Sequence, residues 1–184
     1  MVLTKTPICN FGEKPHSFEL KDVSEKVCNF KDLTGEKGTL IMFICNHCPY
    51  VKAVIKDIVN DANNLKNLNV NTVAIMSNDT KNYPDDSFEN MIKFSKINKF
   101  NFPYLLDETQ ETAKKYGAVC TPDFFGYNRD LELQYRGRIR ELKDLKPVSI
   151  GKSDLFNAMK MIAETGKGPQ NQIPSMGCNI KWFK

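Results

Sequence analysis

The chain lacks any long hydrophobic run. Its longest apolar stretch, residues 40–45, has six residues, whereas about 20 are needed to cross a bilayer. Residues 1–20 also lack the long apolar segment of a secretory signal. We therefore expect a cytoplasmic protein without a membrane partner.

Histidine is scarce, and only one pair of cysteines is close in sequence. The chain has two histidines and six cysteines among 184 residues, and Cys45 and Cys48 form the one close pair. A structural zinc site usually takes four ligands as two close pairs, so we expect no metal. In a reducing cytosol, close cysteines more often do redox chemistry than form structural disulfides.

The basic residues do not gather into a patch typical of nucleic-acid binding. The net charge is only +4, and the lysines are spread along the whole chain, which indicates a solvated surface and no nucleic-acid partner. All four arginines fall within residues 129–140, and we interpret them as a solvated face of a hairpin.

No repeat, low-complexity tract or linker divides the chain. We expect one domain over 1–184, with a loop-rich lead-in (1–15) and a C-terminal tail (166–184) extended over the surface. Strands alternate with helices, which predicts an α/β fold with parallel pairing in its sheet. Asp86, followed by Glu89 three positions later, resembles a capping box that starts a helix. The expected strands are 16–20, 26–29, 39–44, 70–76, 102–106, 123–127 and 131–135, and the expected helices are 51–65, one that opens at about 88, 107–116 and one from about 153.

The segment Cys45-Asn46-His47-Cys48 lies between a buried strand and an amphipathic helix. A helix N-terminus leaves N–H groups unpaired and carries a partial positive charge, which favours a thiolate over a thiol. The spacing lets the two sulfurs meet across the first turn, so one can attack a disulfide and the other resolve the mixed disulfide. We expect Cys45 to be the exposed thiol of low pKa and Cys48 the more buried one.

Together, this segment and the Thr121-Pro122 pair before a later strand resemble the thioredoxin superfamily. Longer stretches resemble a narrower group, the redoxins of the alkyl hydroperoxide reductase/thiol-specific antioxidant class. They are FICNHCPYVKAV, SNDTKNYPDDSFENM, YGAVCTPDFF, YRGRI and GCNIKW.

The resemblance implies a thioredoxin-like fold, with a central mixed sheet flanked by helices and an N-terminal β-hairpin. It also implies a cis peptide at Thr121-Pro122 facing the sulfurs, with Thr121 offering its backbone to a substrate. Cys45 is then the attacking thiol and Cys48 the resolving thiol, and no cofactor is needed beyond this pair.

The residues around the two cysteines have expected roles of their own. Asn46 and His47 are candidates for tuning the redox potential, since an imidazole near the helix start stabilises a thiolate. Cys120 is a possible additional thiol because Pro122 follows it closely. Cys178 lies in the C-terminal tail, and the sequence does not indicate a position in the fold or a role for it.

Three functions fit these residues. The first is thiol–disulfide exchange with protein or small-molecule thiols and an electron donor. The second is a peroxiredoxin-type peroxidase, but Met42 and Cys45 stand where a Thr or Ser is needed three residues before Cys45 or Cys48. The third is a binding module that has kept the fold but no longer catalyses a reaction. The intact cysteine pair argues against this function.

Overall fold

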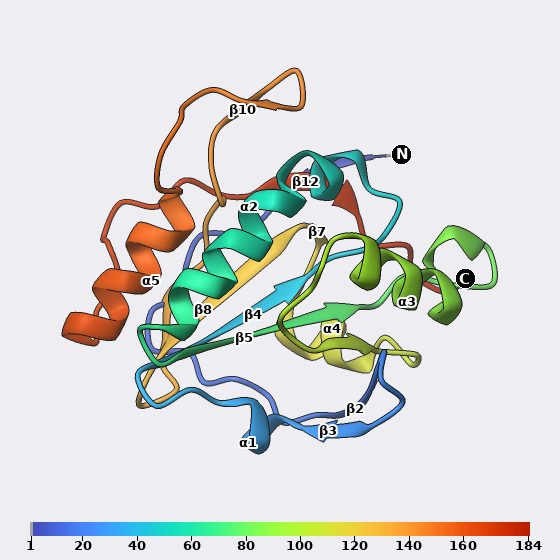
Figure 1. The fold of residues 1–184 in the computed structure, drawn as a ribbon, viewed down its shortest axis with the longest axis horizontal. Coiled ribbons are helices and arrows are strands. Elements are labelled where there is room, and N and C mark those ends of the chain that lie inside the picture. The colour runs from blue at the N-terminus through green and yellow to red at the C-terminus, as the bar shows by residue number, and fades with distance from the viewer. Residues whose placement is uncertain (1) are drawn as a thin grey trace.

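The structure, a computed structural model, describes residues 2–184 and is built on a mixed seven-stranded sheet (Figure 1). The strand order is β3-β2-β6-β5-β4-β8-β9, and the three central strands β6, β5 and β4 are parallel. The strands are β2 (Glu19–Asp22), β3 (Val27–Asn29), β4 (Gly38–Phe43), β5 (Val70–Met76), β6 (Tyr104–Leu106), β8 (Asp123–Asn128) and β9 (Leu133–Tyr135). The predicted α/β class and the N-terminal hairpin, β2–β3, are confirmed.

Helices cover both faces of this sheet, because the central strands are apolar on both sides. One face packs against α2, α3 and α5, and the other against α1 and α4. Alternate residues of β4 divide between the two cores: Met42 lies in the first, and Ile41 and Phe43 in the second. The helices are α1 (Phe30–Leu33), α2 (Pro49–Lys66), α3 (Phe88–Ile97), α4 (Glu111–Tyr116) and α5 (Asp154–Thr165), with a 3₁₀ turn η1 (Pro84–Asp86).

The helix α2 begins where the cysteine segment ends. Cys48 is its N-cap and Pro49 occupies its first turn, where the missing N–H of proline costs little. A buried stripe from Val51 to Leu65 packs α2 on the sheet, as its 3.6-residue period predicts. In Figure 1, α2 and α5 lie side by side across the sheet.

The predicted capping role of Asp86 is wrong. The N-cap of α3 is Ser87, whose side chain accepts the N–H of Asn90. Asp86 ends the preceding turn η1 with its side chain fully buried. Adjacent Asp and Ser are both good caps, so the local pattern does not distinguish them.

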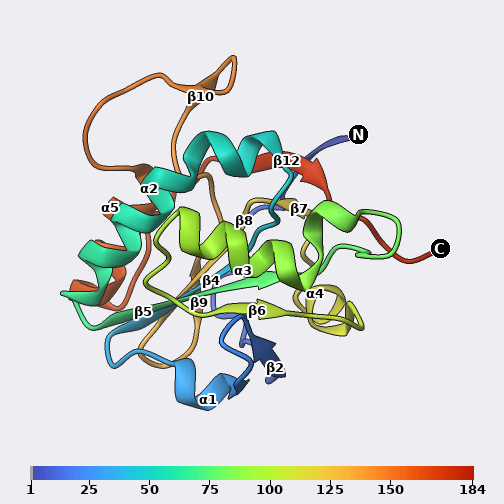
Figure 2. The same cartoon turned by 45° about the vertical axis from the view of Figure 1, so that its right-hand side comes forward.

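The tail does not simply lie over the surface, which corrects the sequence-based expectation. Its strand β12 (Met176–Asn179) lies between β1 (Leu3–Lys5) and β7 (Cys120–Thr121) in a second, three-stranded sheet. Cys178 is 1% exposed. The first and last strands of the chain, β1 and β12, therefore pair with each other, and Figure 2 shows β12 close to the N-terminus.

A small hairpin unforeseen from the sequence projects from the body (Figure 1). It consists of β10 (Leu142–Lys143) and β11 (Lys146–Pro147). Asp144 and Leu145 form its turn with positive φ. Within residues 2–184, no helix combines the length and apolarity needed to cross a membrane.

Candidate active site

The cysteine segment forms a buried loop between β4 and α2. Cys45 is 1% exposed and Cys48 is 0% exposed. The expectation that Cys45 is an exposed thiol is therefore wrong: β12 and the 79–86 segment cover this end of the sheet in addition to the Thr121-Pro122 loop.

Thr121 lies against both sulfurs. Its Oγ1 is 3.4 Å from Cys45 Sγ, and its carbonyl oxygen is 3.1 Å from Cys48 Sγ, which donates to it as a thiol. The Thr121-Pro122 peptide is cis, as predicted. The four residues 45, 48, 121 and 122 predicted to form the site are thus brought together by the fold.

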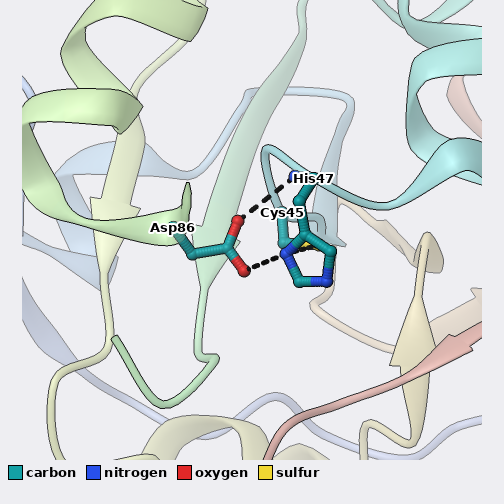
Figure 3. A group of neighbouring side chains, drawn as sticks. All are labelled: Cys45, His47 and Asp86. Carbon is teal, nitrogen blue, oxygen red and sulfur yellow. Dashed lines mark hydrogen bonds and ion pairs between the residues drawn. The ribbon is translucent and has the colours of Figure 1, made fainter. Parts of the chain in front are cut away.

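Asp86 organises the loop from the other side, a role that the sequence did not reveal (Figure 3). Its Oδ1 accepts the backbone N–H groups of Asn46 at 2.8 Å and His47 at 3.3 Å. Its Oδ2 lies 2.6 Å from His47 Nδ1 and accepts Asn78 Nδ2 at 2.8 Å. One buried carboxylate therefore holds the loop that carries both cysteines.

Asn46 anchors the same loop through its side chain. Its amide nitrogen donates to the carbonyl oxygen of Asp85 at 3.1 Å, and its Oδ1 accepts the hydroxyl of Tyr104 at 2.9 Å. These contacts point away from the sulfurs and fix the backbone. A direct effect of Asn46 on the redox potential stays a prediction.

The His47–Asp86 pair is charged over a wider pH range than either group alone. The hydrogen bond with Asp86 raises the pKa of His47 above its ordinary value, against the opposing effect of burial. Although burial raises it, hydrogen bonds from His47 and Asn78 leave the pKa of Asp86 below its ordinary value. The pair places Nδ1 of the His47 imidazole 4.0 Å from Cys45 Sγ.

This histidine is not the base of a Cys–His–Asp relay. Such a relay uses opposite ring nitrogens, one toward the nucleophile and one toward the carboxylate. Here both Cys45 Sγ and Asp86 Oδ2 lie nearest to the same atom, Nδ1. The geometry therefore does not match such a relay.

The two thiols affect each other's pKa. Hydrogen bonding with Cys48 and burial raise the pKa of Cys45 well above its ordinary value. The hydrogen bond from Cys45 lowers the pKa of Cys48 to about 5, against burial. The expectation of a low pKa on Cys45 is thus not met: the lowered pKa belongs to Cys48, and the two groups titrate as a coupled pair.

Cys45, His47 and Asp86 also form the one group of three possible metal ligands among residues 2–184, with ligand atoms within 4.8 Å of one another. The four hydrogen bonds to Asp86 already use both of its oxygens. In this structure Asp86 therefore serves a charged hydrogen-bond network.

A third cysteine meets the pair. Cys178 Sγ lies 2.9 Å from Cys48 Sγ, although 130 residues separate them. Cys120 is equally buried, but its Sγ contacts the carbonyl oxygen of Pro122 at 3.7 Å, and burial raises its pKa. The fold therefore makes Cys178 the additional thiol of the site, in the place that the sequence suggested for Cys120.

The interpretation of the arginines as a solvated face is wrong for two of the four. Arg136 pairs with buried Asp123 at 3.0 Å, and Arg140 pairs with Asp57 at 2.9 Å. Both arginines are less than one-tenth exposed. Arg136 is thereby joined to β8 of the sheet, and Arg140 to α2. Neither arginine contacts the sulfurs.

Comparison with known proteins identifies the family of this chain. The model of the AhpC/TSA family matches residues 11–142. The chain belongs to the AhpC/TSA family. A comparison with curated proteins found no match.

Several solved structures are similar to this chain. An uncharacterized conserved protein from Geobacillus kaustophilus is 40% identical over 100% of this chain and 97% of its own, with a TM-score of 0.94. A hypothetical protein from Sinorhizobium meliloti is 31% identical over 98% of both chains, with a TM-score of 0.90. The thioredoxin domain of a Bacteroides vulgatus thiol-disulfide oxidoreductase shares the fold, at 15% identity over 68% of this chain and 86% of its own, with a TM-score of 0.58. This AhpC/TSA protein is therefore a thioredoxin-fold redoxin.

Proposed function

We propose that this redoxin is a thiol–disulfide oxidoreductase that uses Cys45 and Cys48 as its dithiol. The observation that carries the proposal is the meeting of both sulfurs with Thr121, at the start of an 18-residue helix. The lowered pKa of Cys48 supports one thiolate in the pair at mildly acidic to neutral pH, and a thiolate is the reacting form in exchange.

The exchange proceeds in two balanced steps. The Cys45 thiolate attacks one sulfur of a partner disulfide, forming a mixed disulfide and releasing the other sulfur as a thiolate. Because the pKa of Cys45 is raised and that of Cys48 is lowered, Cys45 becomes the attacking anion by passing its proton to Cys48. The partner thiolate released first takes up this proton, and the Cys48 thiolate then attacks Cys45 Sγ. The Cys45–Cys48 disulfide forms, and the second partner sulfur leaves as a thiolate that takes a proton from water.

Access to Cys45 requires part of the cover to move. The His47 side chain is 17% exposed, and its ring stacks on Tyr83 with centroids 5.9 Å apart and planes 8° from parallel. Tyr83 itself is 39% exposed. We propose that a partner disulfide approaches over this histidine–tyrosine stack, displacing it from Cys45.

The proposed reaction needs no cofactor and no metal, since the electrons come from the thiols. Its partners are protein or small-molecule thiols and disulfides, with a separate electron donor that regenerates the dithiol. We place the reaction in the cytoplasm and propose no nucleic-acid or membrane partner.

A glutathione redox series read by intact mass tests the proposal. The wild type is expected to interconvert between forms 2 Da apart with one midpoint, and the Cys45→Ser variant is expected to lose exchange with small disulfides. Cys120→Ser is the matched control, because Cys120 is equally buried and does not contact the pair. A wild type that exchanges no faster than Cys45→Ser would contradict the proposal.

Peroxide consumption, measured on the same samples, separates exchange from peroxidase activity. Because Met42 and Cys45 stand where the activating hydroxyl is needed, we expect peroxide to react no faster than with a free thiolate. Rapid turnover that disappears in Cys45→Ser would instead favour the peroxidase.

A further inference from the structure

Cys178 is positioned to react with Cys48, and the function proposed above does not use it. The two sulfurs lie 2.9 Å apart, so a bond of ~2.05 Å between them needs a movement of less than about 1 Å. Both residues are at most 1% exposed, so the contact lies inside the protein.

Backbone pairing holds Cys178 at this place. Cys178 is paired with Thr121 of β7 on one side and with Leu3 of β1 on the other. A strand with neighbours on both edges cannot slip by one residue without turning its side chains to the opposite face. The register therefore fixes the sulfur of Cys178 on the face where Cys48 lies.

Gly177 permits this approach. A Cβ added at Gly177 would lie 2.0 Å from the carbonyl oxygen of Thr121, the same oxygen that Cys48 contacts. Any larger residue has to move β12 away from Thr121. The absence of a side chain at this one position brings the third thiol to the pair.

The strand also occupies the backbone edge that the sequence-based interpretation assigned to a substrate. Thr121 is not free for an incoming strand, because it already pairs with Cys178. The chain thus presents its own cysteine, on its own extended strand, to the proposed site.

We propose that Cys178 is a third redox thiol that moves the disulfide within the site. The Cys178 thiol attacks Cys48 Sγ of the Cys45–Cys48 disulfide, the Cys48–Cys178 bond forms, and the Cys45–Cys48 bond breaks with Cys45 as the leaving group. The proton lost by Cys178 is taken up by Cys45, and no net oxidation occurs. The oxidised protein then again has a reactive Cys45. This inference rests on the proposed function for the source of the Cys45–Cys48 disulfide.

Disulfide mapping in Cys45→Ser tests the third thiol without requiring exchange activity. The folded variant is oxidised with diamide, alkylated, digested with trypsin and analysed without reduction. We expect a loss of 2 Da and a cross-link between peptides 38–52 and 168–181, which carry Cys48 and Cys178. Cys45→Ser/Cys120→Ser should give the same cross-link, and Cys45→Ser/Cys178→Ser should give none. A Cys45→Ser protein in which Cys48 and Cys178 both remain alkylatable would overturn the proposal.

The wild type and a glycine variant give the second measurement. Brief alkylation of native, oxidised wild type should label Cys45, and Cys178→Ser should reduce that labelling at least tenfold. Gly177→Ala, which keeps every thiol, should slow formation of the Cys48–Cys178 bond in the Cys45→Ser background at least tenfold. An unchanged rate in a folded Gly177→Ala protein would contradict the role of the register. Should the wild type lack exchange while the cross-link forms, the proposed function fails and the third thiol stands.

Discussion

Two buried carboxylates flank the cysteine pair, and they are stabilised in opposite ways. Asp86 and Asp123 both have fully buried side chains. Asp86 is held by two backbone N–H groups, an amide and an imidazole. Asp123 depends chiefly on one cation, Arg136.

The two pKa values differ in direction for this reason. Burial raises the pKa of Asp123 to about 6 despite Arg136, whereas the hydrogen bonds to Asp86 overcome burial and lower its pKa. Several short donors stabilise a buried charge better than one partner that must itself be desolvated. We infer that Asp123 is a structural ion pair, and that Asp86 sets the electrostatics of the cysteine loop.

Loss of the structural pair is expected to have the largest effect. Arg136→Met leaves Asp123 buried without its cation, which should lower the free energy of unfolding by about 3–5 kcal/mol. Arg138→Met is the matched control two residues away, since Arg138 pairs with Asp154 near the surface and should cost less than about 1 kcal/mol. Urea unfolding measures both, and equal losses would refute the distinction between buried and exposed pairs.

Removal of the Asp86 charge is expected to have an intermediate effect on stability. Asp86→Asn loses the charged acceptor of the loop N–H groups, which should cost about 1–3 kcal/mol at pH 7. The pKa of Asp86 is lowered by folding, so its contribution is present above the ordinary Asp pKa and is lost as the pH falls through the folded value. Urea unfolding from pH 7 to pH 3 should therefore show the wild type and Asp86→Asn converging toward acid; a constant gap would contradict this.

The smallest expected effects are opposite shifts of the redox midpoint. Asp86 raises the pKa of Cys45 through its negative charge, so Asp86→Asn should stabilise the reduced form and make the midpoint less negative. His47→Asn leaves Asp86 without its counter-charge and should make the midpoint more negative, by ~10–30 mV in each case. The glutathione series measures both.

Asparagine is chosen at position 47 because it keeps the backbone N–H that Asp86 accepts, which proline would remove. Shifts of the same sign in both variants would show that the pair does not act on the thiols through charge.

Local patterns predicted most of the fold and, within the site, the segment that carries Cys45 and Cys48. The apolar run before Cys45 and the helical stripe after it lie next to the cysteines in the chain, so short-range rules sufficed for them. Thr121 stands 76 residues from Cys45, and its place beside the sulfurs was predicted from the family resemblance. The strand β5 is found at the predicted residues 70–76.

Partners that only the tertiary fold brings together were missed. Asp86 stands 39 residues from His47 and also fits a helix cap, so its local pattern favoured the wrong role. Cys178 stands 130 residues from Cys48, in a segment whose proline and glycine residues favour an irregular tail. The ion pairs of Arg136 and Arg140 likewise depend on distant carboxylates. The stretches SNDTKNYPDDSFENM and GCNIKW, which carried part of the family resemblance, were the available signal for Asp86 and Cys178.

The position of β12 also has a consequence for how the protein is made. Synthesis proceeds from the N-terminus, so β4, α2 and β8 leave the ribosome before β12 does. Until then β1 lacks the neighbour with which it pairs, and Thr121 and Cys48 lack the strand that covers them. The nascent chain therefore passes through a stage in which the cysteine pair is open to any thiol or disulfide nearby, and closing the second sheet ends that stage.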